Sequence, residues 1–133
     1  MGDPAGIGPE VILKTLASPR LSKLADFFVI GDGSVIDRVS KRLKLKLKAD
    51  LIDMANVSSG DFTFGKPDPS YGKASVEYLD RALELLKNKD ADALVTGPIN
   101  KSSVRDAGLK DFIGHTECLA EDTIMVEIYL TIK

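Results

Sequence analysis

Short apolar runs that end in glycine-containing loops alternate along this chain with stretches of helical periodicity. Residues 26–30 form one such run, closed by the loop 31–33, and residues 91–95 form another, closed by the loop 96–98. A short apolar run between turn signals is typical of a strand buried in a parallel sheet. The order of strand, loop and helix therefore predicts an α/β fold, with a parallel or mixed sheet covered by helices. Ligands of such folds bind beyond the carboxyl ends of the strands.

Four helices are expected. The clearest pattern spans residues 75–89, where apolar side chains recur at helical spacing and charged side chains occupy the opposite face. Residues 34–43 should form a helix whose N-cap is Ser34. Residues 11–16 and a segment that starts near residue 101 complete the set.

Two segments between these helices have distinct patterns. Residues 43–51 alternate apolar and charged side chains, which predicts a strand with one wet face near a sheet edge. Residues 55–71 are rich in glycine, proline, serine and aspartate, which predicts a long loop.

The composition excludes several classes of protein. The 133 residues suffice for one domain, and a content of 44% hydrophobic and 29% charged residues is that of an ordinary globular chain. The net charge of −2 argues against nucleic acid as a partner, and the basic residues between 38 and 48 should form a solvated face. The single cysteine excludes an intramolecular disulfide. No apolar run approaches the roughly 20 residues that span a bilayer, so we expect a cytoplasmic protein without a membrane partner.

The first motif, residues 2–10 (GDPAGIGPE), places three glycines and two prolines before a helix. Glycines and a helix start can offer free N–H groups to a phosphate or carboxylate. A tight turn that requires glycine for its dihedral angles is the alternative. The motif is not a Walker loop and lacks the spacing of the dinucleotide fingerprint, so a nicotinamide cofactor must be held in another manner.

Two further motifs carry candidate side chains. Residues 96–101 (TGPINK) place Lys101 near a helix start, where a cation is unfavourable unless an anion or a carboxylate compensates it. A surface lysine is the alternative. Residues 114–117 (GHTE) contain His115, the only histidine, which could bind an anion or transfer a proton, or could be structural or exposed. Thr116 could cap a helix.

Taken together and in this order, the three motifs resemble the 4-hydroxythreonine-4-phosphate dehydrogenase family. The resemblance implies a three-layer α/β/α fold with a mixed, mostly parallel sheet, similar to isocitrate and isopropylmalate dehydrogenases but incomplete here. Residues 1–121 would be the N-terminal α/β portion of the dehydrogenase, and residues 122–133 a divergent C-terminal tail. The family's strand before the first motif has no expected counterpart in this chain.

The resemblance also implies the chemistry. The family carries out NAD(P)-dependent oxidation and decarboxylation of 4-phosphohydroxy-L-threonine to 3-amino-2-oxopropyl phosphate in vitamin B6 biosynthesis, as a homodimer with a divalent metal (Zn, Mg or Co). His115 and Thr116 match the family's substrate-binding pair. Lys101 is the only candidate for a catalytic residue. The residues expected to line the cleft are Asp3, Gly6, Gly8 and Lys101.

The sequence departs from the family in its histidines. The family's metal site is built from histidines that lie further along, and one histidine cannot form a three-histidine site, so no metal ligand is expected in this chain. We therefore expect an N-terminal fragment with little or no activity alone. Two alternatives stay open. One is a paralogous dehydrogenase that acts on a four-carbon sugar-acid phosphate (erythronate or threonate 4-phosphate), and the other is a non-catalytic remnant that binds a phosphorylated ligand.

Overall fold

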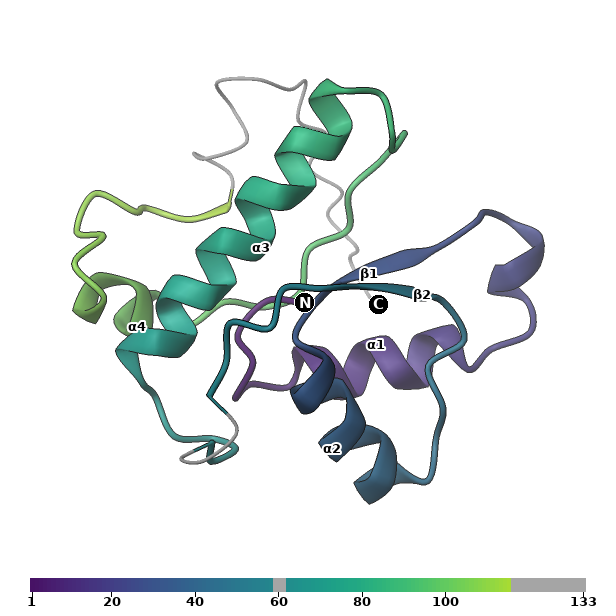
Figure 1. The fold of residues 1–133 in the computed structure, drawn as a ribbon, viewed down its shortest axis with the longest axis horizontal. Coiled ribbons are helices and arrows are strands. Elements are labelled where there is room, and N and C mark those ends of the chain that lie inside the picture. The colour runs from purple at the N-terminus through teal and green to yellow at the C-terminus, as the bar shows by residue number, and fades with distance from the viewer. Residues whose placement is uncertain (59–61, 116–133) are drawn as a thin grey trace, which may run out of the picture.

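A computed structural model describes residues 1–58 and 62–115 of the chain. The elements, in order, are α1 (Gly8–Leu16), η1 (Leu21–Lys23), β1 (Phe28–Gly31), α2 (Gly33–Leu43), β2 (Asp50–Asp53), α3 (Pro69–Lys87) and α4 (Lys101–Asp106). In Figure 1, α1 and α2 lie on one side of the two strands, and α3 and α4 lie on the other. None of the helices in these ranges is long and apolar enough to cross a membrane.

The strands β1 and β2 pair in parallel, with Phe28 opposite Asp50 and Gly31 opposite Asp53. Parallel neighbours require a crossover connection, and α2 supplies it. The predicted α/β class with parallel strands is therefore confirmed. The three-layer arrangement of the isocitrate dehydrogenase type stays a prediction.

Asp32, between β1 and α2, joins three parts of the fold. The side chain is almost fully buried, with 1% exposed. Its Oδ1 accepts hydrogen bonds from the N–H groups of Ser34 (2.9 Å) and Val35 (3.2 Å), and its Oδ2 accepts one from the N–H of Val57 (2.9 Å). Asp32 is thus the N-cap of α2, and it also holds the loop after β2 against the end of β1. The prediction that Ser34 is the N-cap is wrong, since the hydroxyl of Ser34 donates a hydrogen bond to Asp32 instead (2.6 Å).

Two helices begin earlier than predicted. α1 begins at Gly8 instead of residue 11, and α3 begins at Pro69 instead of residue 75. Asp68 caps α3 by accepting a hydrogen bond from the N–H of Ser70 (2.8 Å), and proline is favourable in a first turn, where its missing N–H has no partner to lose. The predicted start was late because Gly72, a weak helix former, interrupts the apolar pattern.

The strand predicted at residues 43–51 is present only at its end, where residues 50–51 belong to β2, and the bounds of the prediction are wrong. α2 continues to Leu43, Lys44 takes a left-handed conformation (φ 54°), and strand pairing begins only at Asp50. The alternation is nevertheless reflected in burial, because the leucines are half-buried while the lysines are exposed. Leu47 packs against the small cluster formed by α1 and α2. A period-two pattern therefore marks an extended segment with one covered face, and it does not require a hydrogen-bonded neighbour.

The predicted strand at residues 91–95 is also wrong, since these residues form no ladder in the structure. Ala91 and Leu94 pack against the larger core cluster, as an apolar run should, but Val95 is 91% exposed. A strand needs a neighbour, and within the described ranges β1 pairs only with β2. On its other edge, the amino group of Met1 donates to the carbonyl of Ile30 (2.8 Å).

The core consists of two clusters of buried side chains. The smaller one lies between α1 and α2 and contains Leu13, Ile36 and Val39. The larger one joins α3 to β1, α2 and the long loop, and its largest aromatic members are Phe62, Tyr71 and Tyr78. The rings of Phe62 and Tyr71 lie 5.4 Å apart. This cluster therefore fixes α3, and with it α4, relative to the strand ends.

The contact between α3 and α4 depends on a glycine. A Cβ atom at Gly72 would overlap the backbone carbonyl of Ser103, so the two helices approach closely only because that atom is missing. Ser103 is fully buried on the other side of this contact. The helix that carries Lys101 is held in place by this packing.

We predict that Gly72→Ala destabilises the protein by about 1–3 kcal/mol, because the backbone of α4 must move to admit the methyl group. Helix propensity alone predicts the opposite sign, a gain of up to about 1 kcal/mol. Urea denaturation followed by circular dichroism distinguishes the two. Lys73→Ala, on an exposed position of the same helix, is the control and should change stability by less than about 0.5 kcal/mol. An equal or higher midpoint for Gly72→Ala would contradict the close contact.

We predict that Asp32→Asn lowers stability at neutral pH by about 0.5–2 kcal/mol, the usual value of an N-cap. Burial alone would raise the pKa of Asp32, but the hydrogen bonds from Ser34, Val57 and Val35 outweigh it and the pKa is lowered. The stabilisation is therefore present above the unfolded-state pKa of about 3.9 and is lost as the pH falls through the lower folded-state pKa. The free energy of unfolding of Asp32→Asn should accordingly fall less steeply with decreasing pH than that of the exposed control Asp37→Asn. Parallel acid profiles for the two variants would refute this role.

Candidate functional site

The opening motif and the loop 96–98 cross each other at close range. The N–H of Asp3 donates to the carbonyl of Pro98 (2.9 Å). Gly2 has a φ of +77°, and a Cβ atom there would overlap that same carbonyl. Two segments almost a hundred residues apart in the sequence are thus joined through their backbones.

The glycines around this crossing make room for Met1. A Cβ atom at Gly8 or at Gly97 would overlap the carbonyl oxygen of Met1, and one at Gly31 would lie 2.9 Å from its side chain. Of the two interpretations of the opening glycines, the contacts of Gly2 and Gly8 therefore support close backbone packing. No ligand is needed to explain these two positions.

The crossing creates a groove beside α4. Asp3, Gly6 and Lys101, three of the four residues expected to line a cleft, do line it, whereas Gly8 lies buried in the first turn of α1. The other lining residues are Ile7, Pro98, Ile99, Asn100 and Ser102. These were missed as individual sites, although each is a member or an immediate neighbour of a motif that was recognised. A second hollow lies on α3 and holds none of the motif residues; its lining residues are Asp80, Leu83, Glu84, Lys87 and Asn88.

Asp3 is the acidic side chain of the groove and is 7% exposed. Its Oδ1 accepts a hydrogen bond from the N–H of Ala5 (2.9 Å), which closes the turn of the opening motif. Burial raises the pKa of Asp3, and hydrogen bonds from the N–H groups of Ala5 and Gly6 offset part of this shift. One carboxylate oxygen is therefore committed to the loop itself.

Lys101, the first residue of α4, also lines the groove. The preceding residue, Asn100, caps the helix by accepting hydrogen bonds from the N–H groups of Ser102 (3.0 Å) and Ser103 (3.2 Å). The side chain of Lys101 is exposed, and none of the ion pairs among the described residues includes it. The hydrogen bonds of Asn100 thus fix the backbone at the start of α4, beside Lys101. The ammonium group of Lys101 lacks a carboxylate partner within the described residues.

His115 is half-buried and lies within electrostatic reach of the same wall. Burial lowers the pKa of His115, and the positive charges of the Met1 amino group and of Lys101 lower it further. Burial also lowers the pKa of the Met1 amino group, to about 6. His115 is thus close enough to feel the charge of Lys101, but it is not one of the residues that line the groove. Thr116, the other half of the expected pair, lies outside the described residues, as does the tail at 122–133.

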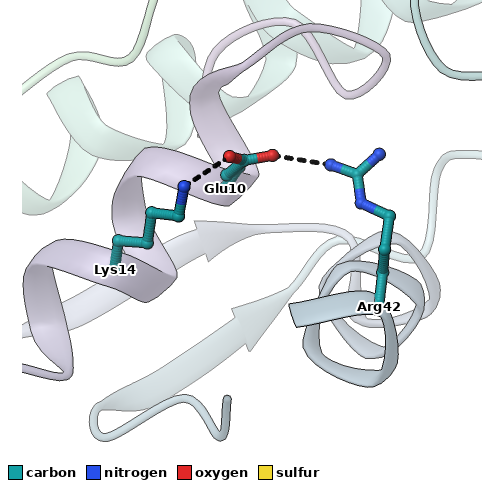
Figure 2. Close-up of polar contacts among 3 residues, drawn as sticks. All are labelled: Glu10, Lys14 and Arg42. Atoms are coloured by element: carbon teal, nitrogen blue, oxygen red, sulfur yellow. Dashed lines mark hydrogen bonds and ion pairs between the residues drawn. The ribbon is translucent and has the colours of Figure 1, made fainter. Parts of the chain in front are cut away.

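The last residue of the opening motif, Glu10, does not belong to the groove. Its carboxylate pairs with Lys14 (2.7 Å) within α1 and with Arg42 (2.6 Å) on α2, as Figure 2 shows. The guanidinium of Arg42 also lies 4.8 Å from the ring centre of Phe64. Glu10 therefore links α1 to α2 by an ion pair, and Arg42 of the basic segment contributes both to this pair and to the contact with Phe64.

The described residues do not fit a metal site. Within the two described ranges, no group of three or more His, Cys, Asp or Glu side chains is placed to hold an ion, and the chain has one histidine. The opening motif does not fit a dinucleotide cradle either, because the Met1 carbonyl fills the space beside Gly8 and Gly97. The chemistry available at this groove is that of its own side chains, namely the ammonium group of Lys101, the buried carboxylate of Asp3 and the apolar surfaces of Ile7, Pro98 and Ile99.

The family model described as pyridoxal phosphate biosynthetic protein PdxA matches residues 23–132. The chain belongs to this family. The resemblance inferred from the three motifs is thereby confirmed, and the PdxA family is one of dehydrogenases.

Two curated PdxA relatives illustrate the likeness. A protein of Fusobacterium nucleatum is 37% identical over 91% of this chain and 41% of its own length. A protein of Symbiobacterium thermophilum is 37% identical over 92% of this chain and 41% of its own length. Both are described as proposed D-threonate 4-phosphate dehydrogenases.

Solved structures of PdxA-type enzymes are also similar to this chain. A 4-hydroxythreonine-4-phosphate dehydrogenase from Burkholderia phymatum superposes with a TM-score of 0.82 at 31% identity, and one from Klebsiella pneumoniae does so with a TM-score of 0.82 at 29% identity. Each match covers 91% of this chain and 41% of the other. The chain therefore spans about two fifths of the length of the relatives it matches.

We predict that Gly97→Ala opens the crossing that builds the groove. The added methyl group would overlap the Met1 carbonyl, and a misfit of this kind costs about 1–3 kcal/mol. Amide hydrogen exchange at Asp3, whose N–H donates to Pro98, should become faster than in the wild type, while exchange at Val35 in α2 stays unchanged. Ser102→Ala, an exposed change nearby, should leave both rates as they are. Unaltered exchange at Asp3 in Gly97→Ala would show that the crossing does not need this glycine.

Proposed function

We propose that this chain forms the substrate-binding half of a PdxA-type dehydrogenase site. The reaction is the NAD(P)-dependent oxidation and decarboxylation of a phosphorylated four-carbon hydroxy acid in a cytoplasmic enzyme. The observation that carries the proposal is the groove where the opening motif meets Lys101, within electrostatic reach of His115. Two motifs that are distant in sequence line one groove, and the third contributes His115 nearby, an arrangement that supports a substrate site.

Each residue of the proposed site has a role that follows from the chemistry of its side chain. Lys101 supplies positive charge for an oxyanion of the substrate, His115 supplies a ring N–H as a hydrogen-bond donor, and Thr116 joins His115 in binding the substrate. Asp3 and Gly6 line the same groove as Lys101. The divalent metal and the nicotinamide are held by other parts of the enzyme, since the described residues fit neither, and the site is completed in a homodimer of the three-layer fold.

Two substrates are candidates within this reaction class. The curated relatives at 37% identity are described as acting on D-threonate 4-phosphate, which favours that substrate. The solved structures, at 29–31% identity, are described as 4-hydroxythreonine-4-phosphate dehydrogenases, and oxidation of that substrate followed by loss of carbon dioxide would yield 3-amino-2-oxopropyl phosphate. The two compounds differ in having a hydroxyl or an ammonium group beside the carboxylate. We place D-threonate 4-phosphate first because its support comes from the higher identities.

The test is a chimeric enzyme in which residues 1–121 replace the matching part of the Fusobacterium nucleatum relative. NAD reduction should occur with D-threonate 4-phosphate, with a higher kcat/KM than with 4-phosphohydroxy-L-threonine. His115→Asn should lower kcat/KM about 100-fold or more, because it removes the imidazole that is proposed to hydrogen-bond the substrate. The matched control, Asp111→Asn, changes an exposed side chain and should leave kcat/KM unaltered. A folded chimera whose kcat/KM is indifferent to His115→Asn would refute the assignment.

A non-catalytic phosphate-binding module is the second candidate. It is favoured by the single histidine and by the lack of a metal-binding group among the described residues. Isothermal calorimetry of the 133-residue chain with D-threonate 4-phosphate and with NAD separates the two functions. Metal-independent binding of the phosphate compound, together with an inactive chimera, would support the module. Turnover by the chimera would exclude it.

A further inference from the structure

One edge of β1 has backbone groups without a partner among the described residues. The residues of a strand direct their N–H and C=O groups to its two sides in turn. The carbonyl of Gly31 accepts a hydrogen bond from the N–H of Met54, on the side of β2 (2.8 Å). The carbonyl of Ile30 accepts one from the amino group of Met1, on the other side (2.8 Å). The N–H groups of Phe28 and Ile30 and the carbonyl of Phe28 therefore point to this second edge, and no backbone hydrogen bond within the described ranges satisfies them.

Met1 shows how wide the space beside this edge is. Its amino group is bonded to Ile30, and a Cβ atom on Gly97 would lie only 2.3 Å from its carbonyl oxygen. A single residue therefore separates the end of β1 from the end of the segment 91–97, and Figure 1 shows the N-terminus beside β1. Two strands on either side of a third lie about 10 Å apart, twice the usual spacing. Met1 thus occupies the position of a central strand, between β1 and a segment that forms no ladder.

Apolar side chains remain uncovered beside the same space. Phe28 is 38% exposed, although it points to the same face of the strand as the buried Ile30, two residues further along. Val95, two residues before Gly97, is 91% exposed. An uncovered strand edge with apolar neighbours is a template for the addition of another strand. The sheet of the described residues is therefore incomplete between β1 and the run 91–95.

The chain contains a segment with the sequence of such a strand. Residues 123–132 (TIMVEIYLTI) contain neither glycine nor proline, and every even position carries an aliphatic side chain. The odd positions carry threonine, methionine, glutamate and tyrosine. The aliphatic residues are Ile124, Val126, Ile128, Leu130 and Ile132. A period of two is that of a strand with one covered face, and here it is a property of the sequence, since these residues lie outside the described ranges.

We propose that residues 123–132 add a strand along the free edge of β1, between β1 and residues 91–95. The aliphatic side chains of this strand cover Phe28 on the face of the sheet that α3 packs against, and its backbone satisfies the N–H groups of Phe28 and Ile30. The same strand gives the run 91–95 the neighbour that it lacks. This inference goes beyond the proposed function and does not rest on it, because it concerns the sheet that carries the opening motif and not the groove.

The connection is long enough for the strand to come from the same molecule. Seven residues, 116–122, join His115 to the segment, and seven extended residues reach about 25 Å. A compact domain of this length has a radius of gyration of about 14 Å. His115 also feels the charge of the Met1 amino group, which is bonded at this edge. A segment tethered in this way has an effective concentration of about a millimolar, which favours it over the same segment of a second copy in dilute solution.

Amide hydrogen exchange followed by NMR in the full 133-residue chain tests this strand. The wild type should protect the N–H groups of Phe28 and Ile30, although no described residue bonds them. Ile128→Pro should accelerate exchange at both about tenfold or more, since proline removes a strand N–H and is excluded from the middle of a sheet. Exchange at Val29 and Gly31, whose N–H groups face β2, should change by less than about twofold.

The matched control is Lys133→Pro, which places the same residue just beyond the segment and should leave all four rates unchanged. Ile128→Ser and Tyr129→Ser form a second, milder pair that leaves the backbone intact. The first lies on the aliphatic face and should accelerate exchange at Phe28 more than the second does. Sedimentation velocity at the same protein concentration should show a monomer.

Exchange at Phe28 and Ile30 in the wild type at the rate of an unprotected peptide would overturn the proposal. Equal rates in the wild type and in both Ile128 variants would overturn it as well. Protection that appears only at high protein concentration, together with a dimer, would assign the edge to a second copy and reject a strand from the same chain. Uniformly faster exchange in Ile128→Pro, including at Val35 in α2, would reflect global unfolding, and the two serine variants then decide.

Discussion

The close crossing of the opening motif with the loop 96–98 is the constraint on which the site depends. The two backbones meet through the hydrogen bond from Asp3 to Pro98, and the crossing is possible only because Gly2, Gly8 and Gly97 have no Cβ atom to fill the space of their neighbours. Since Asp3 and Lys101 belong to the two crossing segments, the same contact sets the width of the groove between them. The backbone geometry of these two segments therefore also determines the geometry of the groove.

That constraint also changes how a glycine-rich motif should be interpreted. Three glycines before a helix suggest a backbone that wraps an anion, but here Gly2 and Gly8 are required by protein atoms. The positive charge at the groove comes from a side chain instead, from Lys101 on a helix held by Gly72. The glycines therefore allow the segments to approach each other and do not themselves form the proposed site.

Much of the fold follows from local signals in the sequence. The helices were predictable because their apolar faces repeat at helical spacing, and the groove was predictable in outline because its walls are the recognised motifs. The failures have a common cause. Residues 91–95 have the composition of a strand but lack a neighbour in the described structure, and the N-cap of α2 is Asp32 because it can also reach Val57, a partner 25 residues away. Strand pairing and long-range caps depend on distant residues, which a local pattern does not contain.

The charges of the groove determine what the rest of the enzyme must supply. Among the described residues the groove offers one exposed ammonium group, on Lys101, and one buried carboxylate, on Asp3, which is partly engaged by the N–H of Ala5. No group of three or more His, Cys, Asp or Glu side chains in these ranges could hold a metal ion. The chain spans about two fifths of the length of the solved relatives it matches. Residues that would hold a metal ion and a nicotinamide in a PdxA-type dehydrogenase would therefore have to come from outside the described part of this chain, where those groups would supply a Lewis acid and a hydride acceptor.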